Sequence, residues 1–292
     1  MKPRVLLALA VLVLACQKSK ETPTDEAGYF DALEANDTKL PKPVPGDWLH
    51  DHPEKGQTFA QYKRKVPVPD AQLTRIYLMP IGSFTNEQQA VMEQVRLYAS
   101  RYFQREVVMM PTLSDAGIPQ SKRRQRDFGE QWLSPYIMDS IVKGRRPADA
   151  LACMAFTAGD LYQSDDWNFV FGEASYAERV GVTSIFRLKF PPQRAHDQHF
   201  FLRRLMNVTT HEIGHMLQMA HCTHALCVMN GSNGMAETDA SPNRACSECQ
   251  RKLHWRLRFD PKKRVGELID FFRTYQLSDD LSRAEEDAEA LP

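Results

Sequence analysis

The chain has 292 residues, of which 42% are hydrophobic and 25% are charged, which is the composition of a globular protein with a sizeable core. Its 37 basic and 37 acidic side chains balance, so composition gives no reason to expect nucleic acid or another polyanion as a partner. The length suits one large domain or two small ones.

The first 15 residues predict an exported protein. Lys2 and Arg4 precede an uninterrupted apolar run over residues 5–15. A helix needs about 20 apolar residues to span a bilayer, so this run is too short for a membrane anchor. Its length and its basic start are instead typical of a signal peptide, which we assign to residues 1–15.

The apolar run ends in the letters VLAC, residues 13–16, which resemble the lipobox of bacterial lipoprotein precursors. The resemblance implies cleavage before Cys16, lipidation of its thiol and attachment of the protein to the bacterial cell envelope. Gln17 rather than aspartate follows the cysteine, so in a two-membrane organism we expect the outer membrane. The alternative is a secretory signal that merely ends in cysteine.

Residues 16–70 are polar and rich in proline, and no helical or alternating pattern is sustained in them. The letters LPKPVPGDW favour extended chain. We therefore predict a tether that leads from the membrane to a folded domain at 71–277 and packs in part near Trp48.

The folded domain shows alternating helix and strand patterns in its first half. We predict strands at 73–82, 106–113, 150–162, 167–175 and 181–190, and helices at 85–103, 126–144, 199–219, 248–259 and 265–277. Thr85 is a candidate N-cap, and Pro135 is a possible break in the second helix. The order of elements predicts an α/β domain. The acidic tail at 278–292 is expected to fray.

The letters HEIGH, residues 211–215, place two histidines four positions apart in a predicted helix. Side chains at this spacing project from one face, so His211 and His215 can bind one zinc ion. Glu212 can then take a proton from a water molecule that the zinc ion activates. Five-residue matches of this kind also arise by chance in roughly 1% of chains this long, so further ligands are needed to support the assignment.

His221 follows six residues after His215, beyond the expected end of the helix. A chain that turns back there supplies a third nitrogen. Three protein ligands and one water are the open coordination that a catalytic zinc ion requires. Together with a downstream methionine, this spacing is the signature of the metzincin metalloproteases.

Four cysteines lie within a short stretch after the histidines. The spacing is C-x4-C followed later by C-x2-C, formed by Cys222, Cys227, Cys246 and Cys249. Two close pairs of this kind suit a structural zinc site with four thiolate ligands. Two disulfides are the alternative, because exported cysteines are commonly oxidised.

The whole string from His211 to Cys249 closely resembles the archaemetzincins, and residues 160–188 resemble the sheet and cleft region of that family. The resemblance implies a metzincin-like mixed twisted sheet with packed helices, an active-site helix and a small zinc-stabilised C-terminal subdomain. It implies a catalytic zinc ion on three histidines, a second, structural zinc ion on four cysteines, Glu212 as general base and acid, and a hydrophobic floor at the active site. The residues concerned are His211, His215, His221, Cys222, Cys227, Cys246, Cys249 and Met229.

Gln218 departs from the metzincin pattern, which has glycine three residues after the second histidine. Glycine adopts positive φ freely, whereas glutamine pays about 1 kcal/mol or somewhat more. Either the turn takes another route or it is strained. Because Cys222 adjoins His221, a zinc ion on the cysteines would fix this turn from its far end.

We expect a zinc-dependent metallopeptidase that hydrolyses peptide bonds in a peptide or protein substrate, acts as a monomer and has no nucleic-acid partner. The alternative is a zinc-stabilised, membrane-anchored binding or assembly protein of the envelope with little or no proteolytic activity. The presence of Glu212 argues against that alternative.

Overall fold

The computed structural model describes residues 26–67, 71–189 and 197–291. The expected signal peptide and Cys16 lie outside these ranges. Within the described parts of the chain, every helix is too short or too polar to cross a membrane.

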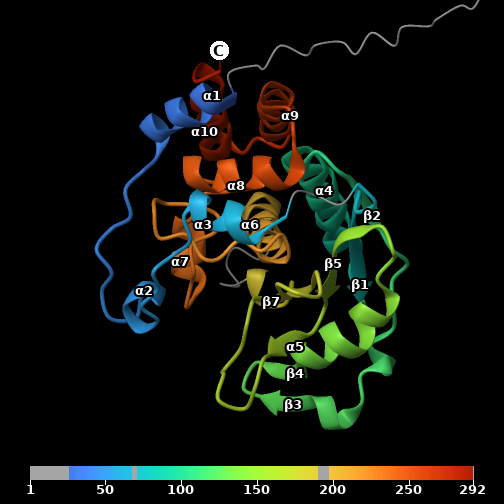
Figure 1. Ribbon diagram of the computed structural model, residues 1–292. Helices are drawn as coiled ribbons and strands as arrows, with labels where there is room; N and C mark the ends of the chain where they lie inside the picture. Colours follow the sequence, from blue (N-terminus) through green and yellow to red (C-terminus); the bar gives the residue numbers. More distant parts are fainter. Residues whose placement is uncertain (1–25, 68–70, 190–196, 292) are drawn as a thin grey trace, which may run out of the picture.

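A five-stranded mixed sheet forms the centre of the molecule (Figure 1). Four strands run parallel, and the edge strand β7 pairs antiparallel to β8. The order across the sheet is β2 (Glu106–Met109), β1 (Arg75–Ile81), β5 (Ala150–Thr157), β8 (Val180–Ser184) and β7 (Gly172–Ser175). The expected mixed α/β architecture is confirmed.

Both faces of this sheet are buried. Successive side chains of a strand point to opposite faces, so burial of neighbouring residues shows that each face is covered. In β1, Ile76 and Leu78 join one hydrophobic cluster, while Tyr77, Met79 and Ile81 join the other. Continuous apolar strands such as β5, which is buried along its whole length, are what a parallel sheet covered on both faces requires.

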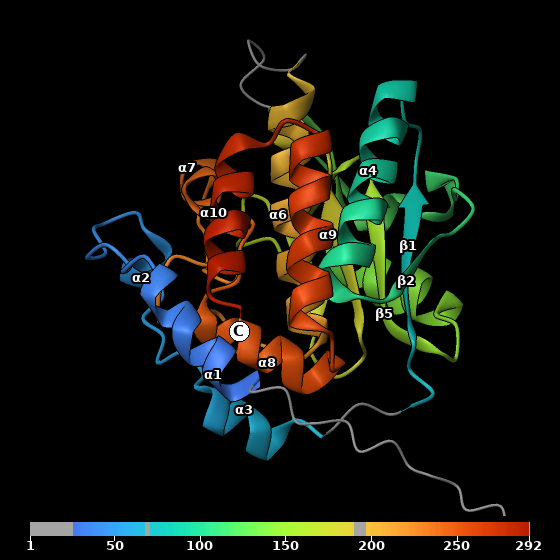
Figure 2. The same cartoon turned by 90° about the horizontal axis from the view of Figure 1, so that it is seen from above.

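Helices α4 (Asn86–Phe103) and α6 (Gln198–Met216), both labelled in Figure 2, pack against one another. Helix α6 also contacts the edge strand β7 and its neighbour β8. Thr85 caps α4 as predicted, since its hydroxyl accepts from the backbone of Gln88. Beyond α6 follow α7 (Met235–Ala240), α8 (Ser247–Leu257), α9 (Pro261–Thr274) and α10 (Ser278–Glu289).

The prediction of one helix over 126–144 was wrong. A second, three-stranded sheet occupies part of this region, formed by β3 (Arg123–Arg126), β4 (Gly129–Leu133) and β6 (Asp160–Tyr162). A helical segment follows only from α5 (Ser134–Tyr136) through a wide-turn helix at Ile137–Val142. Pro135 therefore stands in the first helical turn, where its missing N–H costs nothing, and starts the helix instead of breaking it.

The N-terminal segment differs from the expected polar tether. It forms α1 (Glu26–Ala32), α2 (Trp48–Asp51) and α3 (Phe59–Lys65), drawn in blue in Figure 1 along the C-terminal helices. At most 4% of the surface is exposed in each of its five anchoring side chains, Tyr29, Phe30, Leu33, Tyr62 and Val66. From residue 28 to 67 the segment thus belongs to the folded unit.

The acidic tail is also ordered. Helix α10 packs against α9, and its buried Asp287 accepts from Arg244 at 2.9 Å. Asp280, likewise buried, accepts from Arg203 at 3.2 Å. The predicted fraying was wrong because two of the acidic residues are ion-pair partners of the core and do not face solvent.

Candidate active site and metal centres

Helix α6 brings His211 and His215 onto one face, as their spacing predicts. Their Nε2 atoms lie 2.9 Å apart, and the two rings stand perpendicular to one another. Buried residues occupy most of the helix, which is enclosed by the sheet and by α4. The two imidazoles are therefore held rigidly at the base of a cleft.

The turn after α6 returns the chain so that His221 meets the other two histidines. Gln218 takes the left-handed conformation with φ of 69°, and the N–H of Met219 donates to Gly214 at 3.0 Å. The His221 ring centroid lies 5.2 Å from that of His211 and 4.9 Å from that of His215. One ligand atom from each histidine lies within 4.8 Å of the others.

The Nδ1 atom of each of the three rings forms a hydrogen bond. His211 donates to the carbonyl of Val228 at 2.9 Å, and His215 donates to that of Met219 at 2.7 Å. The Nδ1 of His221 lies 2.8 Å from a carboxylate oxygen of Glu54. These contacts fix the tautomer with the proton on Nδ1, which leaves Nε2 of each ring for a metal ion.

The electrostatic setting suits a divalent cation. Burial, together with the nearby His221, lowers the pKa of His211 to about 4. The same burial, with His211 and His221 beside it, holds the pKa of His215 well below its usual range. Neutral imidazoles are the form that binds metal, so the residues present fit a zinc ion.

Glu212 lies in the wall of the same cleft and is 6% exposed. Burial, followed by the neighbouring carboxylate of Glu173, raises the pKa of Glu212 to about 8. Strand β7 passes so close that a Cβ atom on Gly172 would lie 2.6 Å from Oε1 of Glu212. Glu173 itself is held by hydrogen bonds from Gln163 and Ser134.

Met229 lies beneath α6, where the sequence places a hydrophobic floor. A Cβ atom on Gly214 would lie 2.3 Å from its sulfur, so this glycine lets the methionine approach the helix. The carbonyl of Met229 accepts from the N–H of Cys222 at 2.7 Å. The loop that carries Met229 is thus attached to the residue next to His221.

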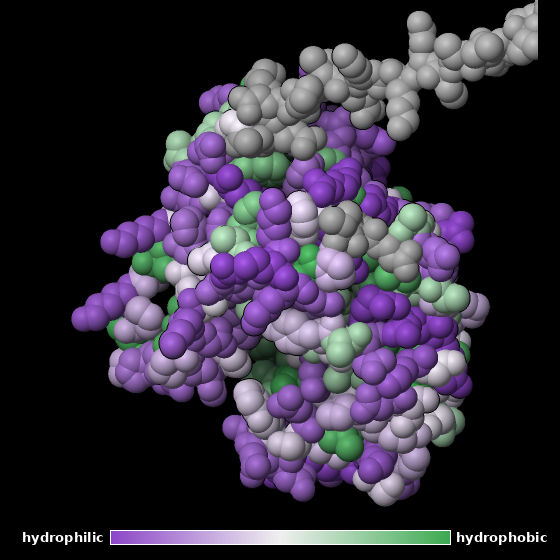
Figure 3. Space-filling view, viewed as in Figure 1, coloured by the Kyte–Doolittle hydropathy of each residue, from purple (hydrophilic) through white to green (hydrophobic). Residues whose placement is uncertain are grey.

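A cleft of about 620 Å³ opens above the three histidines, and Figure 3 shows the hollow between the two halves of the molecule. The edge strand β7 borders it. Further wall residues come from the N-terminal segment and from the loop before β7. His52 of the segment stacks on Trp167 of that loop, with ring centroids 6.2 Å apart, and packs at a tilt against Trp48 at 4.3 Å. Sequence reasoning missed these wall residues, apart from the expectation of packing near Trp48.

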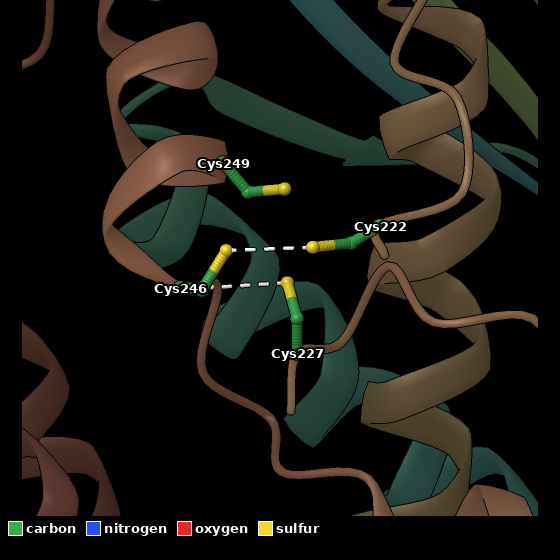
Figure 4. Close-up of side chains that lie close together, drawn as sticks. All are labelled: Cys222, Cys227, Cys246 and Cys249. Atoms are coloured by element: carbon green, nitrogen blue, oxygen red, sulfur yellow. Dashed lines mark hydrogen bonds between the residues drawn. The ribbon is translucent and has the colours of Figure 1, made fainter. Parts of the chain in front are cut away.

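The four cysteines converge at a second centre, where Cys222 and Cys227 from the loop after α6 face Cys246 and Cys249 at the start of α8 (Figure 4). Their sulfur atoms lie within 4.8 Å of one another, and all five cysteines within the described ranges are free. Backbone N–H groups of His224, Met229 and Cys246 donate to these sulfurs at 3.3–3.4 Å.

The charge state of the cysteine cluster also favours a metal ion. The three neighbouring thiols donate to Cys222 and hold its pKa below its usual range, whereas burial raises the pKa of Cys227. Four buried sulfurs so close together cannot all ionise unless a cation compensates their charge. The donor set and the N–H groups directed at sulfur therefore fit zinc.

Comparison with known proteins identifies the family. Residues 136–255 match the model of peptidase family M54. Archaemetzincin-2 from Rattus norvegicus is 30% identical over 257 residues, which cover 76% of this chain and 71% of the relative. The chain belongs to the archaemetzincin family. It is therefore a zinc metallopeptidase, a hydrolase whose substrate is a peptide or protein, and the alternative of a non-proteolytic binding protein is not favoured.

Two further archaemetzincins show the same relationship. The archaemetzincin of Thermococcus kodakarensis is 30% identical over 181 residues, which cover 61% of this chain and 94% of the relative. The crystal structure of archaemetzincin from Methanopyrus kandleri has a TM-score of 0.51 at 23% identity, and the match covers 66% of this chain and all of the neighbour. The latter likeness supports the fold.

Proposed function

We propose that His211, His215 and His221 bind the catalytic zinc ion of this archaemetzincin and that Glu212 is its general base and acid. The observation that carries this proposal is the convergence of three imidazoles, each with Nδ1 in a hydrogen bond, beside a buried carboxylate.

A zinc ion bound here supplies a Lewis acid that acidifies water and polarises a carbonyl group. Glu212 accepts the proton of the attacking water and then gives it to the nitrogen of the leaving amine. The absent side chain of Gly172 leaves room for the carboxylate of Glu212. Met229 supports α6 from below as the hydrophobic floor of the site.

We further propose a second, structural zinc ion on Cys222, Cys227, Cys246 and Cys249, which makes two zinc ions per chain. The free state of these cysteines and the N–H groups directed at their sulfurs support it. This ion would join the loop after α6 to the first turn of α8 and so stabilise the C-terminal subdomain.

The proposed role of Glu212 predicts that Glu212→Gln abolishes turnover. An amide of the same shape cannot accept the proton of the attacking water, while the three histidines still bind zinc. We expect cleavage of a peptide library to fall by a factor of at least about 100 at unchanged zinc content. Retention of full activity by the zinc-loaded variant would show that another group is the base.

We also propose that the mature protein is a monomer anchored to the bacterial cell envelope through lipidated Cys16, at the outer membrane in a two-membrane organism, and that it has no nucleic-acid partner. The short apolar run and the lipobox-like residues 13–16 support the lipid anchor. Cys16→Ser should move the protein from the membrane fraction to the soluble fraction. Equal membrane association of both forms would exclude the lipid anchor.

A further inference from the structure

The N-terminal arm, residues 48–62 from α2 into α3, lies against the turn that carries His221. The matched family region, residues 136–255, does not include it. We propose that Glu54 in this arm is a positioning residue of the active site, which holds the ring of His221 through Nδ1 so that Nε2 faces the metal position. The inference rests on the proposed histidine site and goes beyond it.

Glu54 contacts His221 through both oxygens. Its Oε1 and Oε2 lie 2.8 and 3.1 Å from Nδ1, and the side chains are 30% and 17% exposed. Trp48 donates its indole N–H to Oε1 at 2.9 Å and places its ring perpendicular to that of His221, with centroids 5.1 Å apart. Two residues of the arm therefore restrain one imidazole from two directions.

The arm also holds the backbone of the turn that precedes His221. The side chain of Gln57 donates to the carbonyl of Gln218 at 3.3 Å and accepts from the N–H of Ala220 at 3.2 Å. The buried hydroxyl of Tyr62 donates to the carbonyl of Leu217 at 2.7 Å. These hydrogen bonds hold the backbone at and on both sides of Gln218, the residue with positive φ.

Close backbone packing keeps Glu54 in register with its partner. Gly56, with φ of 67°, approaches Thr223 so closely that a Cβ atom would lie 2.2 Å from the threonine hydroxyl. Gly56 adopts a positive φ that only glycine adopts freely, and its contact with Thr223 leaves no room for a side chain. This contact fixes the arm two residues from Glu54.

The three histidines thus differ in what orients them. His211 and His215 donate to carbonyls of the loop and turn that follow α6, whereas His221 donates to a charged acceptor from a distant part of the sequence. A carboxylate behind a ligating histidine fixes its tautomer and strengthens it as a ligand, and its loss typically costs roughly 10- to 100-fold in metal affinity. The third ligand, which lies outside the rigid helix, gains most from such support.

Three variants of the full chain test the inference: Glu54→Ala, Glu54→Gln, and Asp31→Ala as a matched control. Asp31 is a carboxylate of the same N-terminal segment that pairs with Arg251 and does not line the cleft. Thermal unfolding first establishes that each variant folds.

Zinc affinity at the histidine site is then measured by competition with a chelator. The Nδ1–H proton of His221 is followed by NMR after ¹⁵N-histidine labelling. We expect Glu54→Ala to lose roughly 10- to 100-fold in zinc affinity and to lose the His221 signal, with kcat lowered more than KM at saturating zinc. Glu54→Gln keeps an acceptor oxygen and should lose less, and Asp31→Ala should match the wild type.

Wild-type zinc affinity and an unchanged His221 signal in Glu54→Ala would overturn the inference. If that variant does not fold, wild-type zinc affinity in Glu54→Gln, which keeps an acceptor oxygen but lacks the negative charge, would overturn it. Failure of the proposed function is a separate result, because it would appear as the absence of zinc at the histidines of the wild-type protein.

Discussion

Gln218 shows how a strained residue is accommodated. The sequence indicates the strain, because glutamine stands where metzincins have glycine, and the structure confirms a positive φ of 69°. The expected cost is about 1 kcal/mol or somewhat more. The sequence could not show that Gln57 and Tyr62 brace this turn, since both belong to a segment that reads as a tether. The stabilisation of the turn through zinc on Cys222 stays a prediction.

Gly172 is a second residue on which the geometry of the site depends, because it has no side chain and so leaves room for the carboxylate of Glu212. Gly172→Ala would place a Cβ atom 2.6 Å from Oε1 of Glu212, so that the carboxylate or β7 must move. We expect kcat to fall by roughly 10- to 100-fold at unchanged zinc content, because small misplacements of a reacting group are costly.

Gly144→Ala serves as the control for this change, because the added Cβ meets no atom within 4 Å. Steady-state kinetics on one peptide substrate compare the two variants. A kcat for Gly172→Ala equal to that of the control would mean that Glu212 does not need its observed position.

At the scale of elements, strongly periodic segments were predictable and mixed ones were not. Helices α4 and α6 and strand β1 lie within a few residues of their expected ranges, because the apolar pattern of each is continuous. The single strand expected over 150–162 is instead two strands, β5 and β6, which belong to different sheets. Over 126–144 the apolar residues suit both a strand and a helix. The distinction depends on Trp132, which is buried in β4 by contacts with residues far along the chain.

The helices of the N-terminal segment could not be predicted, for a related reason. Its few large apolar side chains are spread over about 40 residues, so no window of sequence shows a pattern. They are buried in contacts with α8 and its surroundings, as when Phe30 packs on His254 and Phe259. Packing against a distant partner, and not local periodicity, gives this segment its structure.

For the whole molecule, the metal-binding residues could be predicted and the cleft could not. The spacing of the histidines and cysteines reflects their coordination chemistry, and the structure brings both sets together. The wall of the cleft combines Trp48 and His52 with Trp167, more than 100 residues later in the chain. Such a wall exists only after the N-terminal segment has packed, and no local pattern encodes it.

The tertiary contacts connect the region of the two centres to the N-terminal segment and to α10. His221 and Cys222 are neighbours in sequence, and each faces a different cluster. Asp37 of the N-terminal segment pairs with Arg244 at 2.8 Å and accepts from the N–H of Ser247, at the first turn of α8. Asp287 of α10 pairs with the same arginine. The N-terminal segment and α10 thus stabilise the loop between the cysteine pairs.

The assignment of the neighbours His221 and Cys222 to two different metal ions is tested most directly by the number of zinc ions bound to the folded protein. We predict about two zinc ions per wild-type chain and about one in the folded double variant His211→Ala/His215→Ala, with all four clustered thiols free when they are titrated in denaturant. A single zinc ion in the wild type together with oxidised cysteines would contradict the two-site account, as would two zinc ions in the histidine variant.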